Sequence, residues 1–135
     1  MTASNPAAGE RGLLDTSVFV AREAGRPHGA LPAVAAISVI TVAELHLGVL
    51  LADDPATRAQ RLRTLSSVEE LFEPLPIDTS VARVFAELAA EARRQGKRPK
   101  IMDTWIAATA VAHDLPIYTQ DDDFLAITQA HVIRV

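Results

Sequence analysis

Four acidic side chains in this sequence have the type and the placement to hold a divalent metal ion together. They are Asp15, Glu44, Asp103 and Asp121, and each stands just after a short apolar run or at the start of a segment with helical spacing. Crowded carboxylates repel one another and raise one another's pKa unless a cation neutralises them. Because oxygen ligands without Cys or His suit Mg²⁺ or Mn²⁺, we predict a site for one of these ions.

Each acid also has a simpler structural explanation. An Asp at a helix start can cap the helix or complement its dipole. Thr41 and Glu44 have the spacing of a capping box, in which Glu44 serves only the helix start. The metal-site prediction therefore depends on the four acids meeting in space, which depends on the fold.

Short apolar runs alternate with amphipathic segments along the chain, which predicts a three-layer α/β/α fold. Strands are predicted over residues 12–14, 33–37, 72–77, 116–119 and 132–135, the third at a sheet edge because it holds two prolines. Helices are predicted from Val18, over residues 41–52, from residue 55, over 78–96, over 101–113 and from residue 122. This order predicts a central, mostly parallel sheet of about five short strands with right-handed crossovers.

The length and composition indicate one domain, predicted over residues 12–135 and preceded by a flexible segment over residues 1–11. That first segment lacks the apolar core of a signal peptide, and no stretch is long enough to span a membrane, so we expect a cytoplasmic protein. The sequence has no Cys, which excludes disulfides and thiolate zinc sites. Its four His residues are scattered and lack metal-ligand spacing.

The predicted topology brings the four acids to one edge of the sheet. Parallel strands end at a common edge, where doubly wound folds bind ligands. Asp15 follows the first strand, Glu44 lies in the first turn of the helix after the second, and Asp121 follows the strand that ends at Thr119. The helix of Asp103 must run from this edge to the start of that same strand, which places Asp103 at the edge as well.

Hydroxyl and basic side chains accompany the acids. Thr16, Ser17, Ser38 and Thr119 can orient carboxylates or cap their own turns, and we select Thr16 and Thr119 as donors to the acids. The formal net charge of −4 argues against binding a polyanion through overall charge. A local basic cluster nevertheless occurs, formed by Arg93, Arg94, Lys97, Arg98 and Lys100.

Four short motifs, in this order and spacing, make the chain from residue 12 to residue 135 resemble the PIN-domain ribonucleases, and among them the VapC-type toxins of toxin–antitoxin pairs. The motifs are Leu13-Leu14-Asp15-Thr16-Ser17, Ser38-x-x-Thr41-x-x-Glu44-Leu45-x-x-Gly48, Asp103-x-x-Ile106-Ala107-Ala108 and Thr119-x-Asp121-x-Asp123-Phe124.

The resemblance implies an endoribonuclease that depends on Mg²⁺ or Mn²⁺ and hydrolyses RNA phosphodiester bonds to leave a 5′-phosphate and a 3′-hydroxyl. Asp15, Asp103 and Asp121 match the metal-binding acids of the family, Glu44 matches the acid that ligates directly or through water, and Asp123 matches a further acidic position. On this interpretation the basic cluster contacts the RNA backbone.

The resemblance also implies partners. Such toxins inhibit translation until a cognate antitoxin neutralises them, and they commonly form homodimers and toxin–antitoxin hetero-oligomers. The apolar residues Leu45, Leu47, Val49 and Leu50 can form either an antitoxin surface or ordinary core, and we expect core.

Two other interpretations of the acids remain. An aspartyl-intermediate phosphatase also begins with an Asp after its first strand, but it carries a second Asp two residues later, where this chain has Ser17. A non-catalytic metal-binding module of receiver-like fold needs an adjacent acid pair after the first strand and a Lys after the last, and the sequence has neither.

Overall fold

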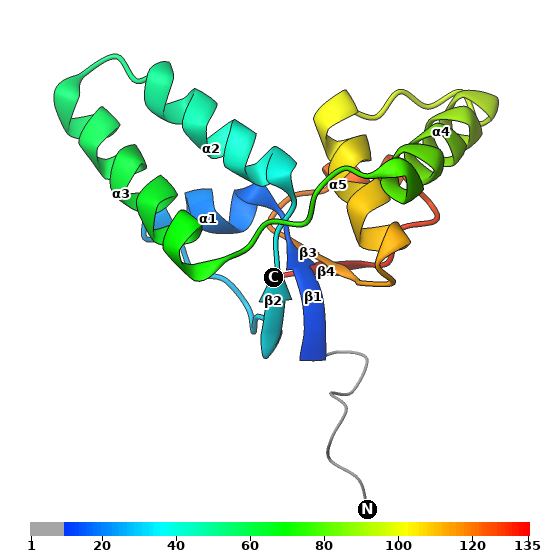
Figure 1. The fold of residues 1–135 in the computed structure, drawn as a ribbon, viewed down its shortest axis with the longest axis horizontal. Helices are drawn as coiled ribbons and strands as arrows, with labels where there is room; N and C mark the ends of the chain where they lie inside the picture. The colour runs from blue at the N-terminus through cyan, green and yellow to red at the C-terminus, as the bar shows by residue number, and fades with distance from the viewer. Residues whose placement is uncertain (1–9) are drawn as a thin grey trace, which may run out of the picture.

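The structure, a computed structural model, describes residues 10–135, in which strands and helices alternate as the sequence predicts (Figure 1). The strands are β1 (Arg11–Leu14), β2 (Val34–Ala36), β3 (Ile117–Thr119) and β4 (Val132–Arg134). The helices are α1 (Thr16–Glu23), α2 (Val39–Leu50), α3 (Pro55–Leu71), α4 (Thr79–Arg94), α5 (Ile101–Ala112) and the 3₁₀ turn η2 (Asp123–Ala126). The predicted flexible segment lies outside the described residues up to residue 9, and Arg11 is the first residue of β1.

The four strands form one parallel sheet in the order β2-β1-β3-β4. The strand predicted over residues 72–77 is wrong: only Leu75 joins the sheet, through a single parallel bridge to Ser38. Its N–H donates to the Ile37 carbonyl at 2.8 Å, and its carbonyl accepts from the Val39 N–H at 3.1 Å. Pro74 and Pro76 flank this residue and have no N–H to donate, so the ladder cannot extend.

Helices α2 and α4 are capped by side chains other than those of the four candidate acids. The side chain of Ser38 caps α2 by accepting from the Ile40 N–H at 3.0 Å, while Thr41 is buried inside the first turn. The predicted capping box of Thr41 and Glu44 is therefore wrong, since the helix begins three residues earlier. Asp78 caps α4 as expected, accepting from the Val81 N–H at 2.9 Å.

The two faces of the sheet are covered by different helices, which makes the predicted three layers. Alternate residues of a strand point to opposite faces. Leu13 and Ile117 accordingly join a cluster with α4, α5 and η2, whereas Leu14 and Tyr118 join a second cluster with α1, α2 and α3. Gly12 allows the Tyr118 ring to cross β1, because a Cβ at Gly12 would lie only 2.3 Å from Cε1 of that ring.

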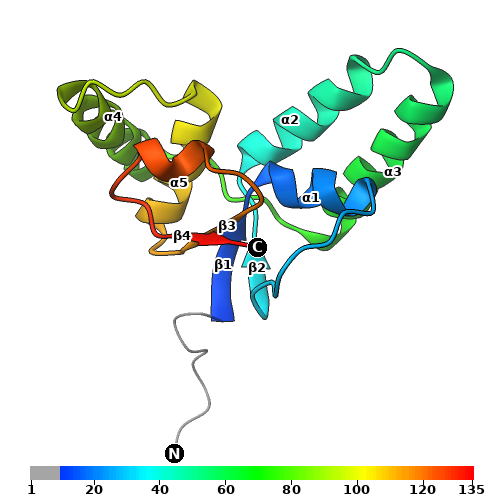
Figure 2. The ribbon, with the colours of Figure 1, turned by 180° about the vertical axis from the view of Figure 1, so that it is seen from behind.

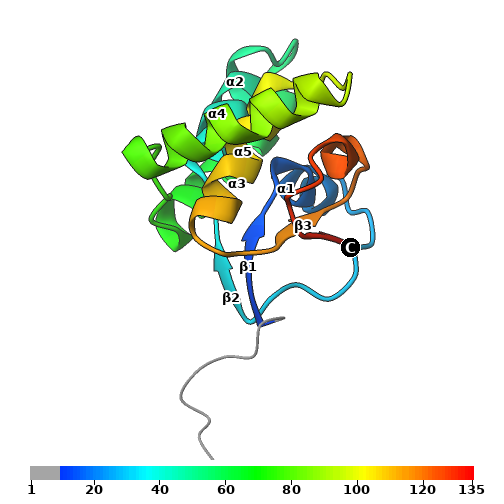
Figure 3. The same ribbon diagram turned by 90° about the vertical axis from the view of Figure 1, so that its right-hand side faces the viewer.

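The helices extend past the carboxyl ends of the strands as two diverging pairs. The α2–α3 pair and the α4–α5 pair stand on opposite sides of the sheet in Figure 1, and α1 lies beside the first pair in Figure 2. The side view of Figure 3 shows β1 and β2 extending below the helices. Both pairs therefore border the sheet edge at which β1 and β3 end. None of the helices in the described part is long and apolar enough to cross a membrane.

Candidate metal centre

The structure brings the four predicted acids to one electrostatic neighbourhood. Asp15 follows β1, Glu44 lies in α2, Asp103 lies in the first turn of α5, and Asp121 follows β3. The charges of Asp15, Glu44 and Asp121 all raise the pKa of Asp103. Within residues 10–135, however, no group of three or more His, Asp or Glu side chains is arranged so that it could hold a metal ion. The four acids therefore influence one another through their charges, and their role as metal ligands stays a prediction.

Asp15 is held at the end of β1 by its backbone and by two hydroxyl groups. Its N–H donates to the Tyr118 carbonyl at 2.9 Å, and its side chain is only 4% exposed. Although Asp15 occupies the N-cap position of α1, its carboxylate makes no capping hydrogen bond. Instead Oδ2 accepts from Ser17 Oγ at 2.6 Å and from Thr119 Oγ1 at 2.9 Å. Burial raises the pKa of Asp15, the two hydroxyl donors oppose this, and the charge of Asp121 adds to it.

Asp103 is the acid whose environment most clearly calls for a cation. Asp103 is 8% exposed. Its Oδ2 atom is buried and has no hydrogen-bond partner among the described residues. Burial first, and then the charges of Asp15, Asp123, Glu44 and Asp121, raise the pKa of Asp103 to about 7. A buried carboxylate oxygen without a donor is costly, and a cation is the group that would satisfy it. This orphaned oxygen fits the predicted divalent ion.

Helix α5 positions Asp103 through its small residues. Ala107, Ala108 and Ala110 are completely buried, which lets α5 pack closely between the sheet and its neighbouring helices. The residue at the N-cap is Lys100, which makes no side-chain capping bond, so Asp103 is not the cap of this helix. The simpler structural explanation of Asp103 as a cap is therefore wrong.

Glu44 is half-buried and is oriented by Thr16. The Thr16 hydroxyl donates to Glu44 Oε1 at 2.6 Å and lies 3.0 Å from Thr41 Oγ1. Burial raises the pKa of Glu44, and the charges of Asp15 and Asp121 add to this, while Lys100 opposes it. Glu44 therefore belongs to the same charge cluster as the aspartates and not to a capping box.

The three consecutive aspartates after β3 point to different partners. Asp122 pairs with Arg134, and Asp123 Oδ2 accepts from Lys100 Nζ at 3.1 Å. Asp121 has no ion pair among the described residues; its Oδ1 accepts from the Asp123 N–H at 3.1 Å, and its charge acts on Asp15 and Glu44. Asp121 therefore acts on Asp15, Glu44 and Asp103, while Asp123, although it is paired with Lys100, also acts on Asp103.

The two threonines selected from the sequence both contact acids, and Ser17 joins them. Ser17 donates to Asp15 and accepts from the Gln120 N–H at 3.0 Å, which links the ends of β1 and β3. Ser17 was not among the two donors predicted from the sequence, although its position two residues after Asp15 is the spacing of a local side-chain donor. Ser38 only caps its helix.

Removing the Thr119 hydroxyl tests this support. We expect Thr119→Val to weaken Mn²⁺ binding by about 10- to 100-fold, because Asp15 loses a donor that orients it. Isothermal titration calorimetry measures the affinity. Thr128→Val, at an exposed position outside the cluster, is the control and should leave the affinity unchanged. Equal affinities for both variants would contradict a positioning role for Thr119.

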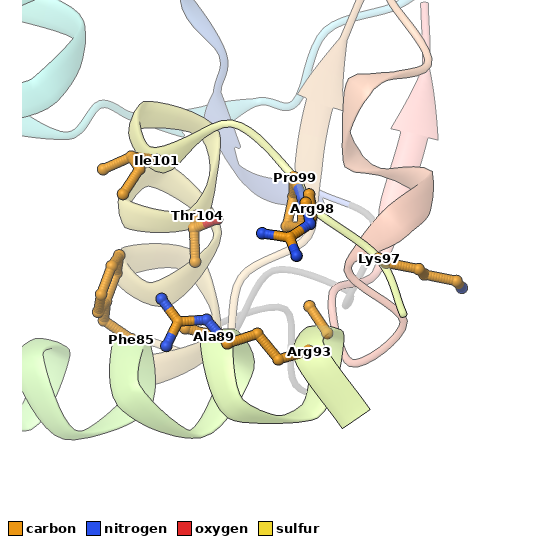
Figure 4. A pocket seen from close by; sticks show the side chains of 9 residues that line it. Phe85, Ala89, Arg93, Lys97, Arg98, Pro99, Ile101 and Thr104 are labelled. Carbon is orange, nitrogen blue, oxygen red and sulfur yellow. The ribbon is translucent and has the colours of Figure 1, made fainter. Parts of the chain in front are cut away.

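The five residues of the predicted basic cluster differ in their partners. Arg94 pairs with Glu91 at 3.0 Å, and Lys100 pairs with Asp123. The other three, Arg93, Lys97 and Arg98, line a pocket of about 180 Å³ between α4 and α5 (Figure 4). The five residues therefore have two kinds of surroundings, although they are close in sequence.

A second pocket, of about 270 Å³, lies between α1 and α2 and includes Thr16 and Glu44. The expectation that the leucines and valine of α2 are all core is wrong for two of them. Leu45 and Val49 are buried, whereas Leu47 is 52% exposed and Leu50 is 64% exposed. Residues four apart share a helix face, so Leu45 and Val49 turn inward while Leu47 and Leu50 turn toward solvent.

The chain matches the PIN-domain family over residues 12–129. It is 46% identical over 134 residues to "Ribonuclease VapC5" of Mycobacterium tuberculosis, covering 98% of this chain and 96% of that protein. It is 44% identical over 127 residues to "Ribonuclease VapC4" of the same organism, covering 93% of this chain and 97% of that protein.

Solved structures agree with the sequence comparison. A crystal structure described as a member of the VapBC family of toxin–antitoxin systems, VapBC-5 from Mycobacterium tuberculosis, aligns with a TM-score of 0.83 at 46% identity, covering 93% of this chain and 99% of that one. The crystal structure of FitAcB from Neisseria gonorrhoeae aligns with a TM-score of 0.73 at 32% identity, covering 90% and 95%.

Proposed function

Because the chain belongs to the PIN-domain family, and within it resembles the VapC ribonucleases along nearly its whole length, we propose that it is the endoribonuclease toxin of a toxin–antitoxin pair. It hydrolyses RNA phosphodiester bonds with a divalent metal ion and so inhibits translation until its antitoxin neutralises it. The single observation that carries this proposal is the convergence of four acids, one of them with a buried and unpartnered carboxylate oxygen.

The metal site we propose is formed by Asp15, Glu44, Asp103 and Asp121. Oxygen-only ligands favour Mg²⁺ or Mn²⁺. When bound, such an ion lowers the pKa of a coordinated water and stabilises the charge that develops on the phosphate. Asp15 is held in place by Ser17 and Thr119.

The remaining groups of the site orient and bury the acids. Thr16 orients Glu44, and burial in α5 keeps Asp103 away from bulk water. Asp123 pairs with Lys100 and also raises the pKa of Asp103, so it is an additional acid beside the four that we propose as ligands. Because burial and mutual repulsion raise the pKa of Asp103 and of Glu44, the acids gain most from a cation when they are ionised.

The antitoxin surface that we propose is the pocket between α1 and α2 together with the exposed leucines of α2. The pocket includes Glu44 and Thr16, so a segment bound there would reach the acids and block the site. Leu47 and Leu50 add exposed apolar surface on the same helix. Relatives of known structure are described as toxin–antitoxin complexes, which supports a hetero-oligomer. A homodimer and a cytoplasmic location stay predictions.

Removal of the metal tests the proposed reaction. Purified protein incubated with total bacterial RNA should produce new 5′-phosphate ends in Mg²⁺ or Mn²⁺ buffer, and EDTA should abolish them. Excess Mn²⁺ added after EDTA should restore cleavage, because the protein supplies ligands and no metal of its own. Asp15→Asn purified in parallel is the control for contaminating nuclease. Cleavage that persists in EDTA and in this variant would contradict the proposal.

The family match disfavours the phosphatase and receiver alternatives, since neither has the PIN fold. A non-catalytic PIN module is the remaining alternative. The presence of all four acids in the sequence disfavours it. Mn²⁺ titration separates the two: a module with a decayed site should show no binding heat, and a module that binds metal should show heat without cleavage.

A further inference from the structure

The pocket between α4 and α5 has no role in the reaction proposed above. It has a volume of about 180 Å³ and opens beside the start of α5, the helix that carries Asp103 (Figure 4). Thr104, the residue next to Asp103, lines this pocket. The pocket and the candidate metal centre therefore share the start of α5, which contributes to them neighbouring residues that project from different faces of the helix.

The charged residues that line this pocket are all basic: Arg93, Lys97 and Arg98. In Figure 4 the Arg98 side chain points toward Thr104, the Arg93 side chain extends beneath Thr104 in the direction of Phe85, and Lys97 points away. No carboxylate of residues 10–135 forms an ion pair with any of the three, although the adjacent Arg94 and Lys100 both have carboxylate partners. Two positive side chains that line one pocket without a counter-ion repel each other, and an anion bound in the pocket relieves this.

The floor of the same pocket is apolar. Ala89, Ala92, Pro99 and Ile101 line it together with the Phe85 ring. Phe85 is held by a stacked contact with Trp105, whose ring centroid lies 3.8 Å away at an interplanar angle of 16°. A simple inorganic anion would leave this floor unused, and an apolar peptide would leave the arginines unused. A nucleotide uses both, since it joins a flat base to a phosphate.

From the basic rim, the apolar floor and the position beside Asp103, we propose that this pocket is a nucleotide subsite for the RNA strand near the bond that is cut. Arg93 and Arg98 bind a phosphate of that strand, and the adjoining base leaves the stack and lies on the apolar floor. The inference rests on the proposed function, because it takes RNA as the substrate. On this proposal Arg93 and Arg98 contact RNA, whereas Arg94 does not, because it pairs with Glu91.

Binding of RNA without cleavage tests the charged part of this subsite. Fluorescence anisotropy of a short labelled single-stranded RNA is measured in EDTA, where no metal-dependent cleavage occurs. Arg93→Ala and Arg98→Ala should each weaken binding about 5- to 20-fold, and each should reduce the slope of log K against log[salt] by about 0.7. Arg94→Ala, one residue away on the same helix, should change neither quantity. Equal effects of Arg93→Ala and Arg94→Ala would overturn the proposal.

A larger side chain on the apolar floor of the pocket tests whether a base binds there. Ala89→Leu should weaken binding of ordinary RNA and leave binding of an abasic RNA of the same length unchanged, whereas Arg93→Ala should weaken both. Ala89→Val serves if the larger side chain disturbs folding, which a thermal melt reveals. Equal affinity of Ala89→Leu and the unsubstituted protein for ordinary RNA would overturn the subsite. So would loss of a homodimer in Arg93→Ala with RNA affinity unchanged, since the pocket would then bind a second copy of this chain.

The two proposals can fail separately. A protein that binds RNA through this pocket in EDTA but never cleaves it would contradict the nuclease and leave the subsite in place. A protein that cleaves RNA with metal, with Arg93→Ala and Arg98→Ala unaffected in RNA binding and in its salt dependence, would contradict the subsite alone.

Discussion

Asp103→Asn should reduce metal-dependent RNA cleavage by at least about 10³-fold, a loss of about 4 kcal/mol in transition-state stabilisation. The substitution keeps the shape of the side chain but removes its charge and replaces one carboxylate oxygen with an amide. Asp103 has the orphaned oxygen, and the charges of the other acids all raise its pKa, so the ion loses the ligand that has no hydrogen-bond partner of its own on Oδ2. Initial rates of 5′-phosphate formation in saturating Mn²⁺ measure the effect.

Asp114→Asn is the matched control for this variant. Asp114 is exposed, lies just after the other end of α5, and has a positive φ of 54°, which Asn adopts readily. Its cleavage rate should stay within about twofold of the unsubstituted protein. A cleavage rate of Asp103→Asn similar to that of the control would remove Asp103 from the metal site, and the four-acid site would then lack its central member.

The same substitution should stabilise the metal-free protein. In EDTA at pH 8 we expect the free energy of unfolding of Asp103→Asn to exceed that of the unsubstituted protein by about 2 kcal/mol. The natural side chain is then ionised, buried and repelled by Asp15 and Glu44, whereas Asn carries no charge. Denaturant titration of both proteins measures this difference in free energy. We expect a smaller difference than the full pKa shift corresponds to, because neighbouring side chains relax around the charge.

The pH dependence of this gain follows from the direction of the shift. The pKa of Asp103 is raised to about 7 in the folded protein from 3.8, so the folded state binds a proton more tightly than the unfolded state does. Stability of the unsubstituted protein in EDTA should therefore fall as pH rises from about 4 to about 7 and level off above that. The advantage of Asp103→Asn should appear over the same window and disappear near pH 4. An advantage that is independent of pH would show that charge burial is not its cause.

Local patterns in the sequence were enough to predict the order of most helices and strands and the sheet edge to which the four acids belong. Apolar runs and helical spacing are local properties, and a parallel sheet sends every strand end to one edge whatever the side chains beyond it do. Asp15, Glu44, Asp103 and Asp121 could therefore be selected before the fold was known.

The partner of each polar side chain depends on the tertiary structure. Asp122 pairs with Arg134 and Asp123 with Lys100, whereas Asp121 has no ion pair among the described residues. Arg93 differs from Arg94 because only Arg94 pairs with Glu91. The predicted edge strand forms only a single bridge, at Leu75. The prolines on both sides of Leu75 have no N–H group, so they cannot donate further hydrogen bonds to the neighbouring strand. Ion pairs and hydrogen bonds join residues that are distant in sequence and depend on distances of a few ångström, which periodicity does not encode.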